Sequence, residues 1–241
     1  AKVRALEGLI ARKMGFESCV AVSGQTYTRK VDAFVLNVLS GIAQSASKMA
    51  TDLRLLSHLK EFDEPFESEQ VGSSAMAYKR NPMRSERVCS LARYVMTDAL
   101  NPAWTAATQW MERTLDDSAN RRIALPEAFL AADAILTLCR NLISGGRVYP
   151  GVMRRHLNEE MPFMATENIL MRAVELGGDR QKLHEKIREY SVETAARVKL
   201  EGGENDLLDK LKADPAFHLD DAALAEILDV KQFIGCAPSQ T

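Results

Sequence analysis

A long run of helically spaced apolar residues constrains the fold of this chain more than any other feature. From about Tyr27 to Leu59, apolar side chains recur at steps of three and four residues, which is the spacing of one face of an α-helix. At ~1.5 Å per residue such a helix is roughly 50 Å long. A helix of this length favours an elongated helical bundle, with part of its apolar stripe completed by other subunits.

Helical periodicity continues through most of the remaining chain, and strand alternation is nearly absent. Further helices are predicted over about 1–14, 82–100, 102–113, 116–144, 150–160, 165–176, 179–201, 204–213 and 220–228. The Gly145–Gly146 pair ends one of them and predicts a domain boundary. We therefore expect an all-α protein, with a central helical-bundle domain over 1–147 and a smaller, truncated helical domain over 148–241.

Short polar residues mark three of the predicted helix starts. Asn81 followed by Pro82 reads as an N-cap and first helical residue, and Asn101 followed by Pro102 repeats the pattern. The segment 116–118, Asp-Asp-Ser, is predicted to cap a third helix because short polar side chains bind free backbone N–H groups.

Composition excludes several classes of function. The chain has 241 residues, is 46% hydrophobic and carries a formal net charge of −2, which argues against a general nucleic-acid or membrane binder. No apolar run reaches the roughly 18 residues of a membrane span, and the charged start does not resemble a signal peptide. The four cysteines are widely spaced, so a zinc site or disulfide framework is not supported, and reduced thiols in the cytoplasm are expected.

The segment Gly72–Pro82 concentrates reactive residues in a loop between periodic helices. Ser73, or the serine after it, is a candidate nucleophile or base. Lys79 and Arg80 can supply the positive field that stabilises its anion, and Asn81 can hold a carboxylate. The alternative is a solvated loop whose serines cap turns. No histidine lies nearby, so a hydrolase triad is not supported.

Arginines follow this loop at the start of the next predicted helix. Arg84 and Arg87 lie where backbone N–H groups favour anions, and guanidinium binds carboxylate or phosphate through two hydrogen bonds. A charged, solvated face that includes Glu86 is an equal alternative. An RNA-contacting patch is less favoured, because Tyr78 lacks interleaved aromatic neighbours.

A second candidate anion site lies in the segment 113–122. Arg113 and Arg122 would point to opposite sides of one continuous helix, but a break at the Asp-Asp-Ser cap would let them converge. Ser118 at the new helix start, with Arg122 one turn later, suits a phosphate. Asp116 and Asp117 oppose this unless they turn away or cap the backbone. A capped helix with surface arginines is the alternative.

A third candidate segment precedes the long helix. Gln25, Thr26 and Thr28 offer neutral hydrogen-bonding groups suited to a base or ribose. On spacing alone, a simple helix cap is the better reading of the segment 23–30.

These segments together resemble the adenylosuccinate lyase family of the fumarase/aspartase superfamily. The matching stretches are 23–30, 72–87 and 113–122, in the family's order, and 162–168 and 184–188 extend the likeness. The loop alone would indicate the superfamily, whereas the stretches around Gln25 and Ser118 point to this branch. The resemblance covers essentially the whole chain.

The resemblance implies a cofactor-free and metal-free β-elimination. Family members release fumarate from adenylosuccinate to give AMP, and from the succinylcarboxamide ribotide of de novo purine biosynthesis. By resemblance, Ser73 is the base that removes the proton beside a carboxylate. The residues that match substrate contacts are Gln25, Lys79 and Asn81, and, for the nucleotide and its phosphate, Arg87, Arg113, Ser118 and Arg122.

The resemblance also implies a homotetramer with a shared helical bundle, whose active sites each draw residues from three subunits. The family's general-acid histidine belongs to an earlier segment, and none of this chain's four histidines matches it. We therefore expect the chain to be part of a longer enzyme and to be inactive in isolation. The alternatives are another superfamily lyase, such as argininosuccinate lyase, and a non-catalytic helical scaffold.

Overall fold

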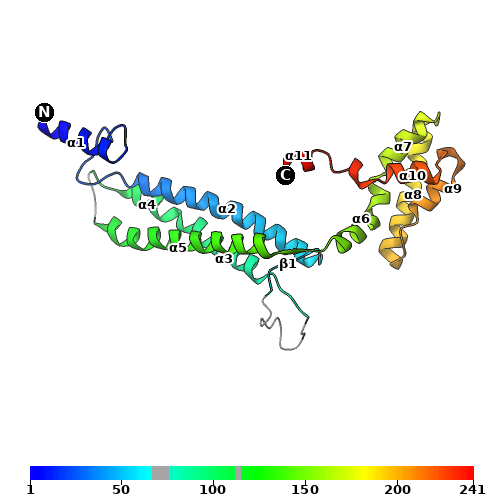
Figure 1. Cartoon of the computed structure of the whole chain (residues 1–241), viewed down its shortest axis with the longest axis horizontal. Coiled ribbons are helices and arrows are strands. Elements are labelled where there is room, and N and C mark those ends of the chain that lie inside the picture. Colours follow the sequence, from blue (N-terminus) through cyan, green and yellow to red (C-terminus); the bar gives the residue numbers. More distant parts are fainter. Residues whose placement is uncertain (67–75, 77, 112–114) are drawn as a thin grey trace. The chain divides into compact units, whose positions relative to one another are not determined.

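The computed structural model describes residues 1–66, 76, 78–111 and 115–241. It divides into two compact units, Ala1–Val148 and Tyr149–Thr241. The described chain is predominantly helical, which confirms the expected all-α class (Figure 1). None of the described helices is long and apolar enough to cross a membrane.

The first unit is built around three long helices. Its elements are α1 (Lys2–Lys13), α2 (Lys30–His58), β1 (Phe62–Asp63), α3 (Met83–Asp98), α4 (Leu100–Thr108), α5 (Asp116–Gly145) and β2 (Arg147–Val148). Helices α2, α3 and α5 pack against one another along their length. The start of α2 lies beside the start of α5 through Arg29 and Asp117, whereas Thr51, late in α2, contacts Cys89, early in α3.

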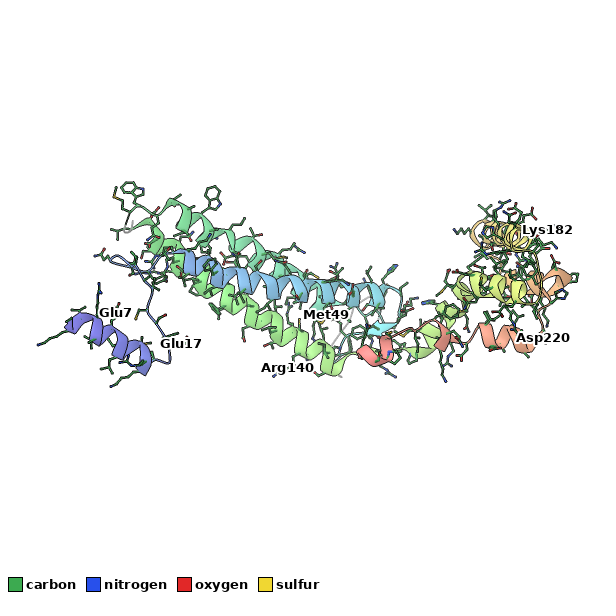
Figure 2. The ribbon with its side chains drawn as sticks, turned by 90° about the horizontal axis from the view of Figure 1, so that it is seen from above. Glu7, Glu17, Met49, Arg140, Lys182 and Asp220 are labelled. Atoms are coloured by element: carbon green, nitrogen blue, oxygen red, sulfur yellow. The ribbon has the colours of Figure 1, made fainter. Side chains whose placement is uncertain are left out.

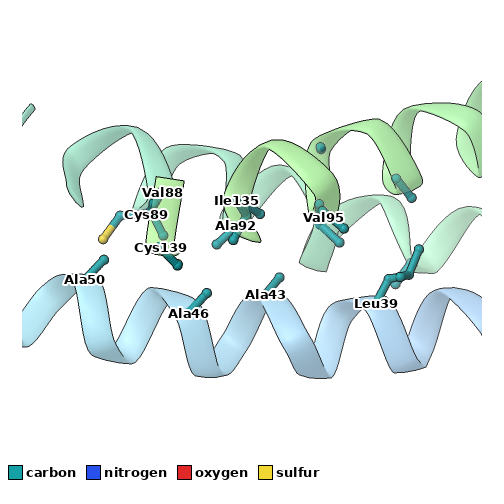
Figure 3. Packing of buried hydrophobic residues seen from close by; sticks show 14 of the residues in the cluster. Leu39, Ala43, Ala46, Ala50, Val88, Cys89, Ala92, Val95, Ile135 and Cys139 are labelled. Atoms are coloured by element: carbon teal, nitrogen blue, oxygen red, sulfur yellow. The ribbon is translucent and has the colours of Figure 1, made fainter. Parts of the chain in front are cut away.

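Small side chains line the core between these helices. Ala43, Ala46 and Ala50 of α2 face the other two helices (Figure 3). The opposing side chains include Val88, Cys89, Ala92, Val95, Ile135 and Cys139. Alanine at the contact lets helix axes approach closely, because little side-chain volume separates the backbones. Figure 2 shows side chains along the same bundle, where Met49 packs against the core and Arg140 is exposed.

The start of α3 corrects one of the sequence predictions. The residue before the helix is Pro82 rather than Asn81, and neither caps the helix with its side chain. Instead, the carboxylate of Glu64 accepts hydrogen bonds from the backbone N–H groups of Arg84 (2.8 Å) and Ser85 (2.7 Å). An acid that is distant in sequence thus accepts two of the backbone N–H groups that have no partner within the helix, and its charge complements the helix dipole.

The other two predicted caps were also wrong. Helix α4 begins at Leu100, so Asn101 and Pro102 lie inside its first turn, and it ends at Thr108 rather than near residue 113. Helix α5 begins at Asp116, but its N-cap residue is Leu115, which makes no side-chain cap, and Asp117 accepts a hydrogen bond from Arg29.

The end of α5 packs against a short antiparallel sheet. Strand β1 pairs with β2 in the register Phe62 to Val148 and Asp63 to Arg147. A side chain at residue 145 would bring Cβ to 2.7 Å from Pro65 Cγ. Glycine at residues 145 and 146 therefore lets this corner close, as well as ending the helix.

The second unit has its own apolar core. Its elements are α6 (Pro150–Met164), α7 (Thr166–Glu175), α8 (Arg180–Glu201), α9 (Leu207–Ala213), η1 (Pro215–Phe217), α10 (Asp221–Ile227), η2 (Val230–Gln232) and α11 (Ala237–Gln240). Ile169, Leu183, Leu211 and Phe217 are among its buried residues. Lys182 and Asp220 are exposed at its surface (Figure 2).

Candidate functional site

The starts of α2 and α5 are joined by two reciprocal ion pairs. Arg29, just before α2, places Nε 2.5 Å from Oδ2 of Asp117 in α5. In return, Arg121 of α5 places Nε 2.5 Å from Oδ2 of Asp32 in α2. Arg29, Asp32 and Asp117 are buried, so these three charges are compensated where water solvates them poorly.

Tyr27 links the two pairs. Its hydroxyl donates to Oδ1 of Asp32 at 2.8 Å and accepts from Arg121. The guanidinium of Arg29 lies over its ring, 4.6 Å from the centroid. Burial, followed by the hydrogen bond to Asp32, raises the pKa of Tyr27, so the phenol remains a neutral donor. Gln109 accepts the backbone N–H of Arg29 at 3.1 Å and adds a third connection at this end of the bundle.

Ser118 and Arg122 lie on α5 beside this network. Ser118 is in the first turn, half-buried, and Arg122 follows one turn later, exposed. Arg122 makes no hydrogen bond or ion pair with the described residues. The charge of Asp117, which opposed an anion at this helix start, is compensated by Arg29. An unpaired guanidinium near a helix N-terminus is therefore available to an anion. Gln25 is exposed in the segment leading into α2 at the same end.

Lys79, Asn81 and Arg87 lie at the start of α3, and all three are exposed. The backbone N–H of Lys79 donates to the carbonyl of Met76 at 2.9 Å. Arg80 lies between Lys79 and Asn81 in sequence, and its guanidinium lies over the Phe66 ring, 4.1 Å from the centroid.

A surface hollow of about 460 Å³ opens beside Asn81. Its wall includes Arg54 and His58 from the end of α2, together with Arg80 and Glu86. The hollow combines cationic side chains with a carboxamide, which are groups that bind carboxylates. Among the described residues, no cluster of His, Cys, Asp or Glu is arranged to hold a metal ion.

Two residues of the sequence-predicted site lie outside the described residues: the candidate base Ser73 and the candidate phosphate ligand Arg113. The predicted convergence of Arg113 with Arg122 therefore remains a prediction.

The described site residues form two groups at opposite ends of the bundle (Figure 1). Gln25, Ser118 and Arg122 lie where α2 and α5 begin, whereas Lys79, Asn81 and Arg87 lie where α2 ends and α3 begins. Helix α2 has 29 residues, so the groups are separated by about 40 Å at the helical rise per residue. One copy of the chain does not bring them together.

Sequence reasoning missed the residues that support these groups. Asp32 was not singled out, Arg29 and Arg121 were not predicted to pair with acids, and the capping role of Glu64 was not anticipated. Asp32 follows Arg29 by three residues and Asp117 precedes Arg121 by four, which is a weak signal of facing charged positions.

Comparison with known proteins places this arrangement in a family. Residues 4–97 match the model of a family described as "Lyase", and residues 162–241 match the model of the adenylosuccinate lyase C-terminus. The chain is 54% identical over 239 residues to adenylosuccinate lyase of Saccharomyces cerevisiae and 52% identical over 241 residues to that of Schizosaccharomyces pombe. The chain belongs to the adenylosuccinate lyase family.

The match to these two adenylosuccinate lyases covers 99% and 100% of this chain but 50% of each relative. The chain therefore spans about half the length of the curated relatives it matches. A family member from Schistosoma mansoni is 51% identical over 240 residues, with the same half covered.

Solved structures share the helical fold of this chain. A 3-carboxy-cis,cis-muconate lactonizing enzyme from Pseudomonas putida matches 98% of this chain and 50% of its own, with a TM-score of 0.77 and 21% identity. A fumarate lyase from Mesorhizobium sp. BNC1 matches 95% and 49%, with a TM-score of 0.74 and 21% identity. At this identity the likeness shows a shared fold alone.

Proposed function

We propose that this chain forms part of an adenylosuccinate lyase, which eliminates fumarate from adenylosuccinate to give AMP and acts likewise on the succinylcarboxamide ribotide of purine biosynthesis. The observation that carries the proposal is the identity of 51–54% to three adenylosuccinate lyases across almost the whole chain. The matched range spans the helical bundle and the positions of both groups of candidate substrate contacts, and it favours this activity over that of argininosuccinate lyase.

In the proposed reaction, the deprotonated Oγ of Ser73 takes the proton from the carbon beside a succinyl carboxylate. The electron pair left behind forms the double bond of fumarate as the C–N bond breaks, and the departing nitrogen takes the bonding pair. That nitrogen gains a proton from a general acid, a role for which none of this chain's four histidines matches the family. Lys79 and Asn81 hold the succinyl carboxylates and stabilise the charge that develops on them.

The nucleotide half of the substrate is assigned to the other end of the bundle. Gln25 contacts the substrate, and Arg113, Ser118 and Arg122 bind the nucleotide with its phosphate. Arg87 is also assigned to the nucleotide by resemblance, although it lies at the opposite end, near the start of α3. Arg122 supports the assignment because it lacks a carboxylate partner among the described residues and follows a helix start.

The distance between the two groups favours an oligomer with shared sites. A nucleotide is far shorter than α2, so one substrate cannot contact both ends of a single copy. A second copy running in the opposite direction would bring the α3 start of one chain to the α2 and α5 starts of another. Exposed apolar side chains on α2 and α5, such as Phe34, Val38 and Ile143, support association. These features favour association of at least two copies, and we propose the homotetramer that the family resemblance implies.

The primary test is fumarate release by the full-length protein. Ser73→Ala is expected to lower kcat about a hundredfold or more, because proton abstraction loses its base. Ser74→Ala is the matched control and is expected to keep most of the activity. A wild-type protein that released no fumarate from adenylosuccinate would refute the proposed function, and a loss confined to Ser74→Ala would refute the choice of base.

Mixing two impaired variants tests the shared sites. Ser73→Ala and Arg122→Ala, refolded together, are expected to regain activity, because some sites then receive an intact residue from each chain. Ser73→Ala mixed with Lys79→Ala is the control, since both residues belong to one end, and should regain none. Equal behaviour of the two mixtures would contradict shared sites.

We also propose a cytoplasmic location for the protein. Cys19, Cys89, Cys139 and Cys236 are all free thiols, which suits a reducing compartment.

A further inference from the structure

Four charged side chains join α2 and α5 beside the candidate phosphate site. Arg29 with Asp117 and Arg121 with Asp32 sum to zero, and each helix start contributes to both pairs. The hydrogen bond to Asp32 raises the pKa of Arg121, so its charge persists. Arg122, the next residue, has no such partner among the described residues and remains a net positive charge.

We propose that Arg29, Asp32, Asp117 and Arg121 are positioning residues for a nucleoside monophosphate. The pairs fix the segment that carries Gln25 against the turn that carries Ser118 and Arg122. The pair of Arg29 with Asp117 also compensates the charge of one of the two acids in the first turn of α5, which favours a phosphate beside Arg122 and the helix N-terminus. This inference rests on the proposed function and assigns roles to residues that do not themselves touch the substrate.

The burial of the pairs favours positioning over stability as their main effect. Desolvating two ions costs about as much as their attraction returns, and apolar residues of similar size often stabilise a protein as well or better. Ion pairs differ from apolar contacts in being directional. With Tyr27 bridging Asp32 and Arg121, they permit one register of α2 against α5, and the separation of Gln25 from Ser118 depends on that register.

Charge compensation explains how an acidic residue can lie beside a proposed phosphate site at this helix start. Asp117 lies in the first turn of α5, next to Ser118. A carboxylate at this position disfavours a phosphate nearby, and Arg29 supplies a buried opposite charge beside it. With Arg29 at 2.5 Å, the field of the pair falls off much faster than that of a single charge. The arginine therefore affects phosphate binding without contacting the phosphate.

The test compares AMP with adenosine, which lacks the phosphate, by calorimetric titration of the full-length protein. Arg29→Met removes the buried cation that lies 2.5 Å from Asp117 and is expected to weaken AMP binding about tenfold more than adenosine binding. The double variant Arg29→Met/Asp117→Asn removes both charges and is expected to restore the wild-type ratio of the two affinities. Asp117→Asn alone frees the charge of Arg29 and should leave the ratio unchanged or raise it.

The second unit offers a matched control. Asp214 accepts from Lys186 at 2.5 Å and from Tyr190 at 3.0 Å, as Asp32 accepts from Arg121 and Tyr27. Asp214→Asn is expected to reduce stability without changing the ratio of AMP to adenosine affinity. A purely structural role for the Arg29 pair would give the same result for Arg29→Met.

The outcomes separate the two proposals. A ratio unchanged in Arg29→Met, or one not restored in the double variant, would overturn the positioning role even if the protein released fumarate normally. If Arg29→Met does not fold, Asp117→Asn still decides, because a lowered ratio in that variant contradicts charge compensation. A wild-type protein without lyase activity would instead count against the proposed function.

Discussion

Asp98, at the end of α3, has two carboxyl oxygens in unequal surroundings. Oδ1 accepts a hydrogen bond from Asn101 Nδ2 at 2.8 Å, whereas Oδ2 is buried without a partner among the described residues. The residue is 6% exposed, and burial raises the pKa of this carboxyl above its usual 3.8. The folded state therefore disfavours the ionised form.

Asp98→Asn is expected to raise the free energy of unfolding at neutral pH by about 1 kcal/mol, because the amide carries no charge for burial to disfavour. A raised native pKa means that the wild-type gains stability as pH falls through that pKa, so the advantage of the variant should shrink in acid. Urea unfolding of both proteins at several pH values measures this difference in the free energy of unfolding. The exposed Asp133→Asn is the control, and a destabilised Asp98→Asn protein at pH 7 would contradict the account.

Helix packing in the first unit depends on small residues at the contacts between α2, α3 and α5. Ala43 and Ala128 are fully buried between long helices. Their methyl groups fill the available space, so the helices lie close and their ends, which carry the site residues, keep a defined register. Close packing of this kind leaves no room for larger side chains.

Ala43→Leu is expected to cost about 1–3 kcal/mol of stability, because added methylenes force α2 away from its neighbours. Thermal unfolding of the full-length protein measures the loss. Ala196→Leu, at an exposed position of α8, is the control and should change stability little. Equal stability of the two variants would mean that the bundle is less tightly packed than described.

At the scale of the whole molecule, the exposed apolar residues of the bundle point to association. Phe34 is 60% and Val38 is 65% exposed in the single chain, one turn apart on α2. Contiguous apolar surface of this kind marks interaction sites. The separation of the two groups of site residues gives a functional reason for the same association.

The double variant Phe34→Asp/Val38→Asp is expected to lower the mass of the full-length protein in light scattering, because burying two new carboxylates at an interface is costly. Helix content by circular dichroism should persist, and fumarate release should fall with the mass. Gln44→Asp, on another face of α2, is the control. An unchanged mass in the double variant would exclude this face from the interface.

The sequence by itself determined the helical class and most helix positions. Apolar spacing predicted α2 from 27 to 59, and the helix spans Lys30–His58; the predicted 179–201 agrees with α8, Arg180–Glu201. These features depend on interactions within a few residues of the chain, namely helical periodicity and glycine stops. The order of the motifs also supplied the family, which the comparisons confirmed.

Only the tertiary structure decided how distant charges pair. Arg29 and Asp117 are 88 residues apart in the chain, and Arg121 and Asp32 are 89. Likewise, Glu64 rather than a local residue caps α3. The strength of a hydrogen bond or an ion pair depends on separation in space, which chain spacing does not encode across a loop. For the same reason, the placement of the candidate site residues at two ends of one bundle emerged only once the helices were packed.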